Sequence, residues 1–153
     1  MEKVDRAMEQ RVWKRVRGEE LPPLLQELAA AELGSAAMFL MLSRQMQGSD
    51  KELLRRLYFE EKRHSAILQG MYTAITGQPL QLRTPPPEPG TPQNCLRKCY
   101  AGALQAFTAY GQRCEDSQYA PVFAELAKQE QAHCAAVLEL LGKLTLPSKG
   151  PLA

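Results

Sequence analysis

The sequence predicts an all-α protein, an antiparallel four-helix bundle with one long connection between its second and third helices. Of its 153 residues, 44% are hydrophobic but only 7% are aromatic, a composition that suits a helical domain with one core. Apolar residues recur at steps of three and four over long stretches, the spacing that places them on one face of a helix. A proline-rich segment interrupts this pattern halfway along the chain.

Residues 1–20 are expected to form an N-terminal amphipathic helix. Its apolar side carries Val4, Met8, Val12, Trp13 and Val16, and its other positions are rich in arginine and lysine. Such a helix packs on the bundle or on a second subunit. Binding to a membrane surface is the weaker interpretation, because acidic residues are interspersed among the basic ones.

The first two helices of the bundle are expected to form a hairpin. The first begins near Pro22, a residue suited to a first helical turn, and runs to about Gln47. The second starts from Ser49, with Glu52 three residues later as a capping box, and ends near Gly77. The link between them is short, so they must be antiparallel neighbours.

The second hairpin follows an extended crossover over residues 78–94, a segment too rich in proline to be helical. The third helix begins with Thr91-Pro92 as cap and first turn and runs to about Glu115. The fourth runs from around Pro121 to Leu141, with Gly142 as its stop. The bundle thus spans residues 21–146, and residues 147–153 form a tail.

Two copies of Glu-x-x-His lie within these helical patterns and use both histidines of the chain. They are Glu61-Lys62-Arg63-His64 and Glu130-Gln131-Ala132-His133. Residues three apart share a helix face, so each copy directs a carboxylate and an imidazole to one point. Each copy also interrupts an apolar seam, which reads Leu54, Leu57, Glu61, His64, Leu68, Met71, Ile75 in one case and Phe123, Leu126, Glu130, His133, Val137, Leu140, Leu144 in the other.

A carboxylate within a core seam is unfavourable unless it is paired, protonated or bound to metal. Metal coordination explains all four residues at once, and a pair of crossed Glu–His ion pairs explains them too. The motifs are separated by 130 − 61 = 69 residues, and the first helix aligns with the third at about the same shift. The chain therefore looks like a diverged repeat in which each half supplies one motif helix.

Residues 21–144 resemble rubrerythrin-type members of the ferritin-like superfamily. The resemblance rests on Leu28, Glu32 and Phe39 in the first helix, Glu60-Glu61-x-x-His64 in the second, Leu96, Ala103 and Tyr110 in the third, and Ala127, Glu130 and His133 in the fourth. It implies a ferritin-like bundle in which Glu61 and Glu130 bridge two metal ions, each histidine holds one ion, and Glu32 is a terminal ligand.

The third helix departs from the family pattern, because Ala103 stands where a ligand carboxylate is expected. Cys99 and Tyr100 lie one turn earlier and are candidate substitutes, although core packing is the more ordinary role for both. Glu32 likewise has an alternative role as a seam carboxylate paired to a histidine. The implied metal is iron, two ions if the site is complete, and ligand type alone also admits manganese or zinc.

The functional expectation is a metal-binding, iron-dependent redox protein that reduces peroxide or oxidises ferrous iron, with peroxide or dioxygen as reactant and an incomplete di-metal site. The alternative is a non-catalytic degenerate bundle that binds one ion or none and serves as a structural or interaction module. None of the four cysteines forms a Cys-x-x-Cys pair, so a rubredoxin-type knuckle is not expected.

Composition also bears on partners and location. A net charge of +2 gives no broad basic surface, so nucleic acid is not an expected partner. No signal peptide or membrane span is recognised, and the expected location is the cytoplasm. The family resemblance implies a homodimer. No catalytic residue is assigned from the sequence.

Overall fold

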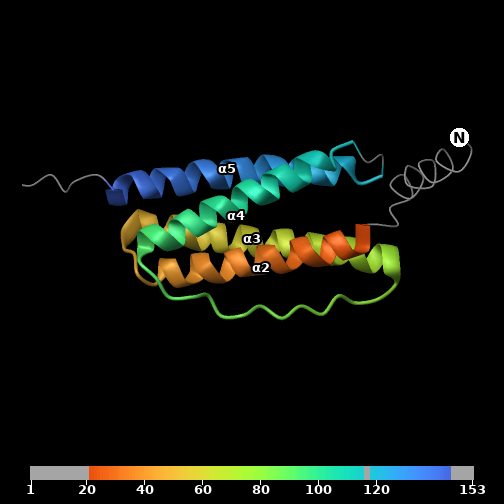
Figure 1. The fold of residues 1–153 in the computed structure, drawn as a ribbon, viewed down its shortest axis with the longest axis horizontal. Helices are drawn as coiled ribbons and strands as arrows, with labels where there is room; N and C mark the ends of the chain where they lie inside the picture. Colours follow the sequence, from red (N-terminus) through yellow and green to blue (C-terminus); the bar gives the residue numbers. More distant parts are fainter. Residues whose placement is uncertain (1–20, 116–117, 146–153) are drawn as a thin grey trace, which may run out of the picture.

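The computed structural model describes residues 21–115 and 118–145, which form four helices: α2 (Leu21–Ser43), α3 (Gly48–Thr76), α4 (Pro92–Gln112) and α5 (Ala120–Thr145). They pack as two hairpins, α2 with α3 and α4 with α5, that lie one on the other (Figure 1). The predicted all-α antiparallel four-helix bundle is confirmed. The helix expected over residues 1–20 and the tail at 147–153 lie outside the described residues.

The connection between the hairpins determines the topology. Residues 77–91 contain no regular structure and run back along the outside of α2 for the length of the bundle (Figure 1). As a result α4 starts at the same end as α3 and runs in the same direction. Prolines keep this segment extended, since they supply no backbone N–H and clash with a helical turn. The predicted crossover is therefore confirmed, except that residues 92–94 belong to α4.

Two predicted helix ends agree with the structure. Thr91 caps α4, its hydroxyl accepting a hydrogen bond from the backbone N–H of Asn94 at 3.2 Å, and Pro92 occupies the first turn. Gly77 ends α3 in the left-handed conformation, with φ of 71°, and its N–H donates to the carbonyl of Thr73 at 2.8 Å. Glycine adopts this conformation without the steric penalty of a Cβ atom.

Other predicted ends were wrong. α2 stops at Ser43 rather than Gln47, and α3 begins at Gly48 after Gln47, so Ser49 lies inside the first turn and forms no capping box. Gly48 has φ of 61°, which lets the chain reverse tightly at this point. α4 ends at Gln112 before the expected Glu115. α5 continues through the expected stop at Gly142 to Thr145.

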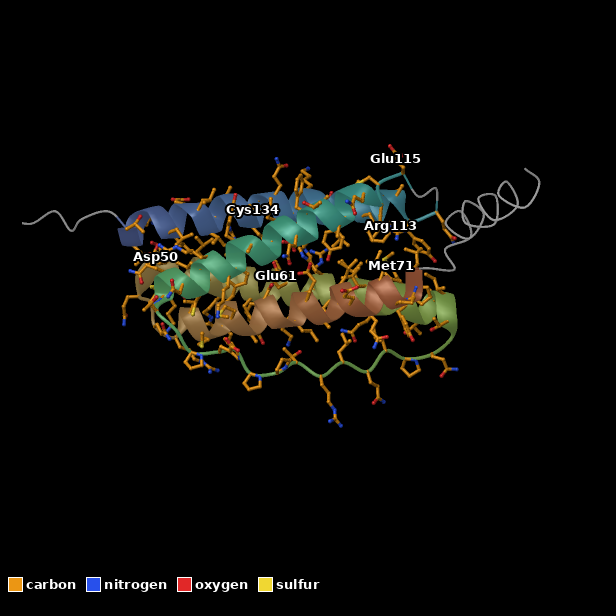
Figure 2. The ribbon with its side chains drawn as sticks, in the orientation of Figure 1. Asp50, Glu61, Met71, Arg113, Glu115 and Cys134 are labelled. Carbon is orange, nitrogen blue, oxygen red and sulfur yellow. The ribbon has the colours of Figure 1, made fainter. Side chains whose placement is uncertain are left out.

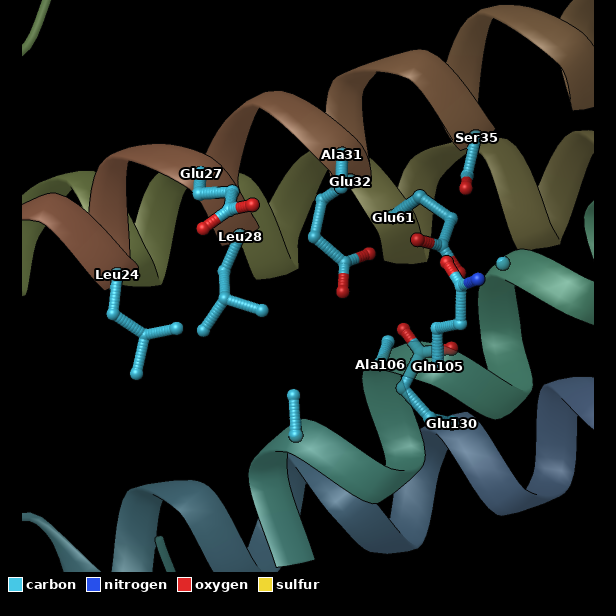
Figure 3. A pocket seen from close by; sticks show the side chains of 12 residues that line it. Leu24, Glu27, Leu28, Ala31, Glu32, Ser35, Glu61, Gln105, Ala106 and Glu130 are labelled. Carbon is cyan, nitrogen blue, oxygen red and sulfur yellow. The ribbon is translucent and has the colours of Figure 1, made fainter. Parts of the chain in front are cut away.

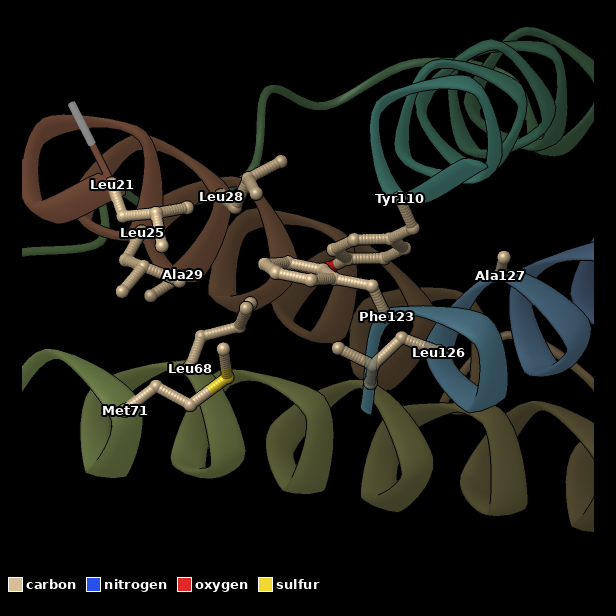
Figure 4. Close-up of a cluster of buried hydrophobic side chains, with 10 residues drawn as sticks. All are labelled: Leu21, Leu25, Leu28, Ala29, Leu68, Met71, Tyr110, Phe123, Leu126 and Ala127. Carbon is tan, nitrogen blue, oxygen red and sulfur yellow. The ribbon is translucent and has the colours of Figure 1, made fainter. Parts of the chain in front are cut away.

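The apolar core consists of two clusters at opposite ends of the bundle. The first surrounds Tyr110 and Phe123, whose rings lie 6.2 Å apart, and is drawn in Figure 4. The second surrounds Phe39 and includes Leu54, Leu57, Cys95, Leu96, Cys99, Val137 and Leu140. The predicted seams of α3 and α5 are buried except at their last members, Ile75 and Leu144, which are half-buried. Glu61 lies between the two clusters, near the middle of the bundle (Figure 2).

α2 is the most apolar helix. By length and composition alone it is able to span a membrane, with a mean hydropathy of 1.3 over its most apolar window. Core helices have the same composition, and α2 contributes a buried face that runs from Leu21 to Ser43 and contains the ionisable residue Glu32.

We expect the core seam to carry much of the stability of the bundle. Leu68 is completely buried in the first cluster, so Leu68→Ala should lower the free energy of unfolding by roughly 2–5 kcal/mol through lost burial and an unfilled cavity. Urea unfolding followed by circular dichroism measures this change. Leu138→Ala is the control, because Leu138 is 50% exposed, and an equal loss in both variants would contradict the assignment of the core.

Candidate metal centre

The two Glu-x-x-His motifs meet in the interior of the bundle. Glu61 and His64 come from α3, Glu130 and His133 come from α5, and all four side chains are at most 2% exposed. One ligand atom from each residue lies within 4.8 Å of all the others. These residues meet because each motif occupies one face of its helix and the two faces are directed toward each other. The juxtaposition expected from the sequence is therefore present.

Each imidazole reaches across to the carboxylate of the other helix. Nδ1 of His64 lies 3.0 Å from Oε1 of Glu130, and Nδ1 of His133 lies 2.5 Å from Oε1 of Glu61. The two rings are nearly parallel, with centroids 5.3 Å apart and planes inclined by 15°. The arrangement has the approximate twofold symmetry expected of a diverged repeat.

The outer nitrogen of each imidazole has a partner that sequence reasoning missed. Nε2 of His64 donates to Oε1 of Gln129, and Nε2 of His133 donates to Oε2 of Glu60, both over 2.6 Å. The Gln129 amide is oriented in turn by its own N–H bond to Glu125, 3.1 Å long. The available signal was that Glu60 and Gln129 both immediately precede a motif glutamate.

These outer partners decide which imidazole nitrogen carries a proton and which one has a lone pair available for a metal ion. An acceptor at Nε2 keeps a proton there, so the neutral form of each ring carries its lone pair on Nδ1. Nδ1 is the nitrogen directed at the carboxylates. Metal-binding histidines are commonly held by this kind of hydrogen bond from the non-coordinating nitrogen.

Glu32 joins the cluster from α2 but stands outside the compact group of four. Its Oε2 atom lies 3.6 Å from Nδ1 of His64, and its Oε1 atom accepts a 2.5 Å hydrogen bond from the hydroxyl of Tyr110 on α4. Burial and the Glu32 carboxylate raise the pKa of Tyr110, so the hydroxyl remains a donor. Glu32 is thus oriented by one neighbour while it presents its other oxygen to the cluster.

Burial and mutual charge shift the ionisation of the cluster in the metal-free protein. Burial raises the pKa of Glu61 well above its usual range, and the neighbouring Glu32 carboxylate adds to this shift. Burial opposes ionisation of Glu130 as well, but hydrogen bonds to both histidines lower its pKa to about 2. For His64, burial is outweighed by Glu130 and Glu32, which raise its pKa to about 10, and the pKa of His133 is raised by Glu130 in the same way. Protons on the imidazoles therefore balance the carboxylates.

The residues present fit a divalent cation. Oε2 of Glu32 and Oε2 of Glu130 are buried and have no hydrogen-bond partner among the described residues. Unpartnered buried carboxylate oxygens are unfavourable, and a cation bound between them would satisfy both. A mixture of carboxylate oxygens and imidazole nitrogens suits iron, manganese and zinc, and the cluster itself does not select among them.

The second half of the repeat lacks the counterpart of Glu32. Ala103 occupies that position and is buried, and Phe39 occupies the position equivalent to Tyr110, since both pairs are separated by 71 residues (103 − 32 and 110 − 39). The carboxylate and the hydroxyl that orients it are therefore both missing on this side.

Neither proposed substitute for the missing ligand belongs to the compact group. Cys99 is buried in the second apolar cluster, and Tyr100 is half-buried at its edge. Burial, the nearby charge of Glu61 and the thiol of Cys95 raise the pKa of Cys99 to about 12. All four cysteines carry free thiols.

Comparisons with protein-family models, with curated proteins and with solved structures give no match. The four-helix architecture and the buried Glu/His cluster are compatible with a ferritin-like fold. That compatibility rests on geometry alone.

We expect the metal-free protein to lose stability as the pH rises above neutrality. The pKa of His64 is about 10 in the folded chain, against 6.5 for an ordinary histidine, so the stability from its protonated form is complete below pH 6.5 and is lost as the pH approaches 10. The raised pKa of Glu61 acts in the same direction, whereas the lowered pKa of Glu130 affects stability only in acid.

Urea unfolding in the presence of a metal chelator should give a free energy of unfolding about 3 kcal/mol lower at pH 9 than at pH 6. His64→Gln should reduce this slope and leave the part that His133 and Glu61 contribute, and a wild-type slope that is already flat would contradict the ion-pair assignment.

Proposed function

We propose that this protein binds iron in the Glu/His cluster and is a redox protein of the rubrerythrin type, acting on peroxide or on ferrous iron. One observation carries the proposal: two imidazoles and three carboxylates are buried in one cluster, and two of the carboxylate oxygens have no hydrogen-bond partner among the described residues. A purely structural pair of crossed Glu–His contacts would not need the third carboxylate, Glu32, or its tyrosine.

In peroxide reduction, the bound iron would supply the electrons that reduce the O–O bond. In ferrous iron oxidation, the iron would give its electrons to an oxidant. The chain supplies the ligands and their orientation. Glu61 and Glu130 would contribute ligands to both metal positions. His64 and Glu32 would complete one of them, because Nδ1 of His64 and Oε2 of Glu32 are only 3.6 Å apart. His133 would serve the other position.

The surrounding residues position these ligands and control access of water. Gln129 and Glu60 keep the imidazole protons on Nε2, and Tyr110 fixes the rotation of Glu32. The apolar clusters on either side exclude water along the axis of the bundle, which strengthens electrostatic interactions at its centre. A buried site of this kind limits unproductive reaction of a reduced ion with solvent.

A second candidate is a bundle that binds one ion and does not catalyse. Ala103 and Phe39 favour it, because the position served by His133 lacks both the terminal carboxylate and the residue that would orient it. Under this proposal the ion at the Glu32 side is structural, and the protein acts through its surface. The homodimer and the cytoplasmic location remain predictions under both candidates.

Metal binding should depend on the carboxylates of the cluster. Anaerobically purified protein incubated with ferrous iron should retain one or two ions per chain, and Glu61→Gln should weaken binding on the order of a hundredfold by removing a shared ligand. Plasma emission spectroscopy and titration with a competing chelator measure the stoichiometry and affinity, and peroxide turnover tests the redox proposal. Glu139→Gln on the exposed face of α5 is the matched control. A folded wild-type protein that retains no iron, manganese or zinc would refute metal binding.

Restoring the missing carboxylate should distinguish the two candidates. Ala103→Glu is expected to raise the bound metal from about one ion toward two, because the position served by His133 then gains a terminal ligand. The metal-free variant should be less stable than wild type, since it buries another carboxylate, and added metal should reverse this loss. Ala101→Glu, at an exposed position of the same helix, is the control. Unchanged stoichiometry in a folded variant would contradict the missing-ligand explanation.

A further inference from the structure

A cavity of about 320 Å³ lies between α2 and α4 and reaches the cluster (Figure 3). Its inner end is formed by the carboxylates of Glu32, Glu61 and Glu130. Neither histidine lines it, so the cavity meets the cluster on its carboxylate side. Glu32 and Glu130 are the two residues whose Oε2 atoms have no hydrogen-bond partner in the described part of the chain.

Small side chains on α4 create this space. Gly102, Ala106 and Ala109 line the wall formed by α4 together with the longer, polar Gln105, and Leu28 and Ala31 line the wall formed by α2. Larger residues at these α4 positions would fill the gap. At Gly102, for example, a Cβ atom would lie 3.5 Å from the hydroxyl of Ser35. The cavity is therefore a consequence of the local sequence of α4.

We propose that this cavity binds a neutral, largely apolar organic molecule with one oxygen-bearing end next to the cluster, and that the substrate class is an alkyl or aryl hydroperoxide. The choice of substrate rests on the proposed redox function, whereas the binding of a neutral organic molecule rests on the cavity. The apolar walls favour the organic group, and the carboxylate end favours a hydroxyl or hydroperoxyl group that can donate a hydrogen bond.

Size and charge both support this class of ligand. A water molecule occupies about 30 Å³ in the liquid, so the cavity exceeds the volume of hydrogen peroxide several times over, and it falls within the range of small-molecule sites. Within residues 21–115 and 118–145, no lysine or arginine lines the cavity, and Glu27 adds a fourth carboxylate to its walls. An anionic ligand would find no cationic side chain among the described residues of these walls, so the lining disfavours an anionic occupant.

The metal that the cluster is proposed to hold would supply the electrons for the corresponding reaction. Reduction of a hydroperoxide ROOH breaks its O–O bond and yields ROH and water. Where both metal positions are filled, two ferrous ions would supply one electron each, and two protons would come from solvent. The apolar group R is not altered, and its role is to select and orient the substrate within the cavity.

Binding is testable without turnover by using 2-phenyl-2-propanol, the unreactive alcohol derived from an aryl hydroperoxide. The full chain, metal-free and with zinc added, is titrated while the methyl NMR signals of Leu24 and Leu28 are followed, since both side chains line the cavity. We expect saturable shifts in both forms. Benzoate, an anion of similar size, should bind about tenfold more weakly to the metal-free protein.

Variants that fill the cavity locate the binding site. Ala106→Phe on the α4 wall and Ala31→Leu on the α2 wall should each weaken binding of the alcohol by about tenfold or more. Ala101→Phe on the exposed side of α4 should leave binding unchanged. Thermal unfolding verifies that each variant is folded, and two variants on opposite walls protect the test against the failure of one.

The outcomes separate this inference from the proposed function. Saturable binding that both cavity variants weaken supports the inference even if no metal is retained, in which case only the redox assignment fails. Absence of saturable shifts in a folded wild-type protein overturns it, even if the cluster binds iron. Equal weakening by Ala101→Phe, or benzoate binding to the metal-free protein as tightly as the alcohol, also overturns it.

Discussion

The burial of three carboxylates and two imidazoles at the centre of the bundle is the constraint on which the rest of the structure depends. Unpaired charges in such a place are strongly unfavourable, so each must have a partner. The helices meet this requirement by exchanging partners: His64 on α3 contacts Glu130 on α5, and His133 on α5 contacts Glu61 on α3. Any relative sliding or rotation of α3 and α5 would break both contacts, so the cluster fixes the register in which the two hairpins pack.

The two halves of the cluster are related but chemically unequal. On one side Glu32 is oriented by Tyr110, and on the other both members of the equivalent pair are apolar, Ala103 and Phe39. A hydroxyl without its carboxylate would be a buried donor lacking an acceptor, so it is physically consistent that both are absent together. The outer partners differ as well, a carboxylate for His133 and an amide for His64. An imidazole that is hydrogen-bonded to a carboxylate is a stronger metal ligand than one that is hydrogen-bonded to an amide. Glu60 therefore compensates in part for the terminal carboxylate that is missing at the position served by His133.

The apolar clusters and the cavity give the centre its environment. The first cluster around Tyr110 and Phe123 and the second around Phe39 close the bundle on either side of the polar layer. Their packing along the axis contrasts with the small residues of α4, which leave space beside α2. Access to the carboxylates is therefore lateral, between two helices from different hairpins. The same helix, α4, lacks one ligand carboxylate at Ala103 and, through Gly102, Ala106 and Ala109, leaves the space that reaches Glu32.

The sequence by itself determined the helical class, the crossover and the convergence of Glu61, His64, Glu130 and His133, because helical periodicity assigns each side chain to a face. It also placed Ala103 where the repeat loses a carboxylate. Only the tertiary structure decided which imidazole nitrogen faces the cluster, that Glu60 and Gln129 hold the other nitrogen, that Tyr110 orients Glu32 and that a cavity lies between α2 and α4. These features depend on rotamers and on the offset between helices from different hairpins, which no local pattern encodes. The wrong helix ends at Ser49 and Gly142 have a related cause: local end signals are weak, and the packing of neighbouring turns outweighs them.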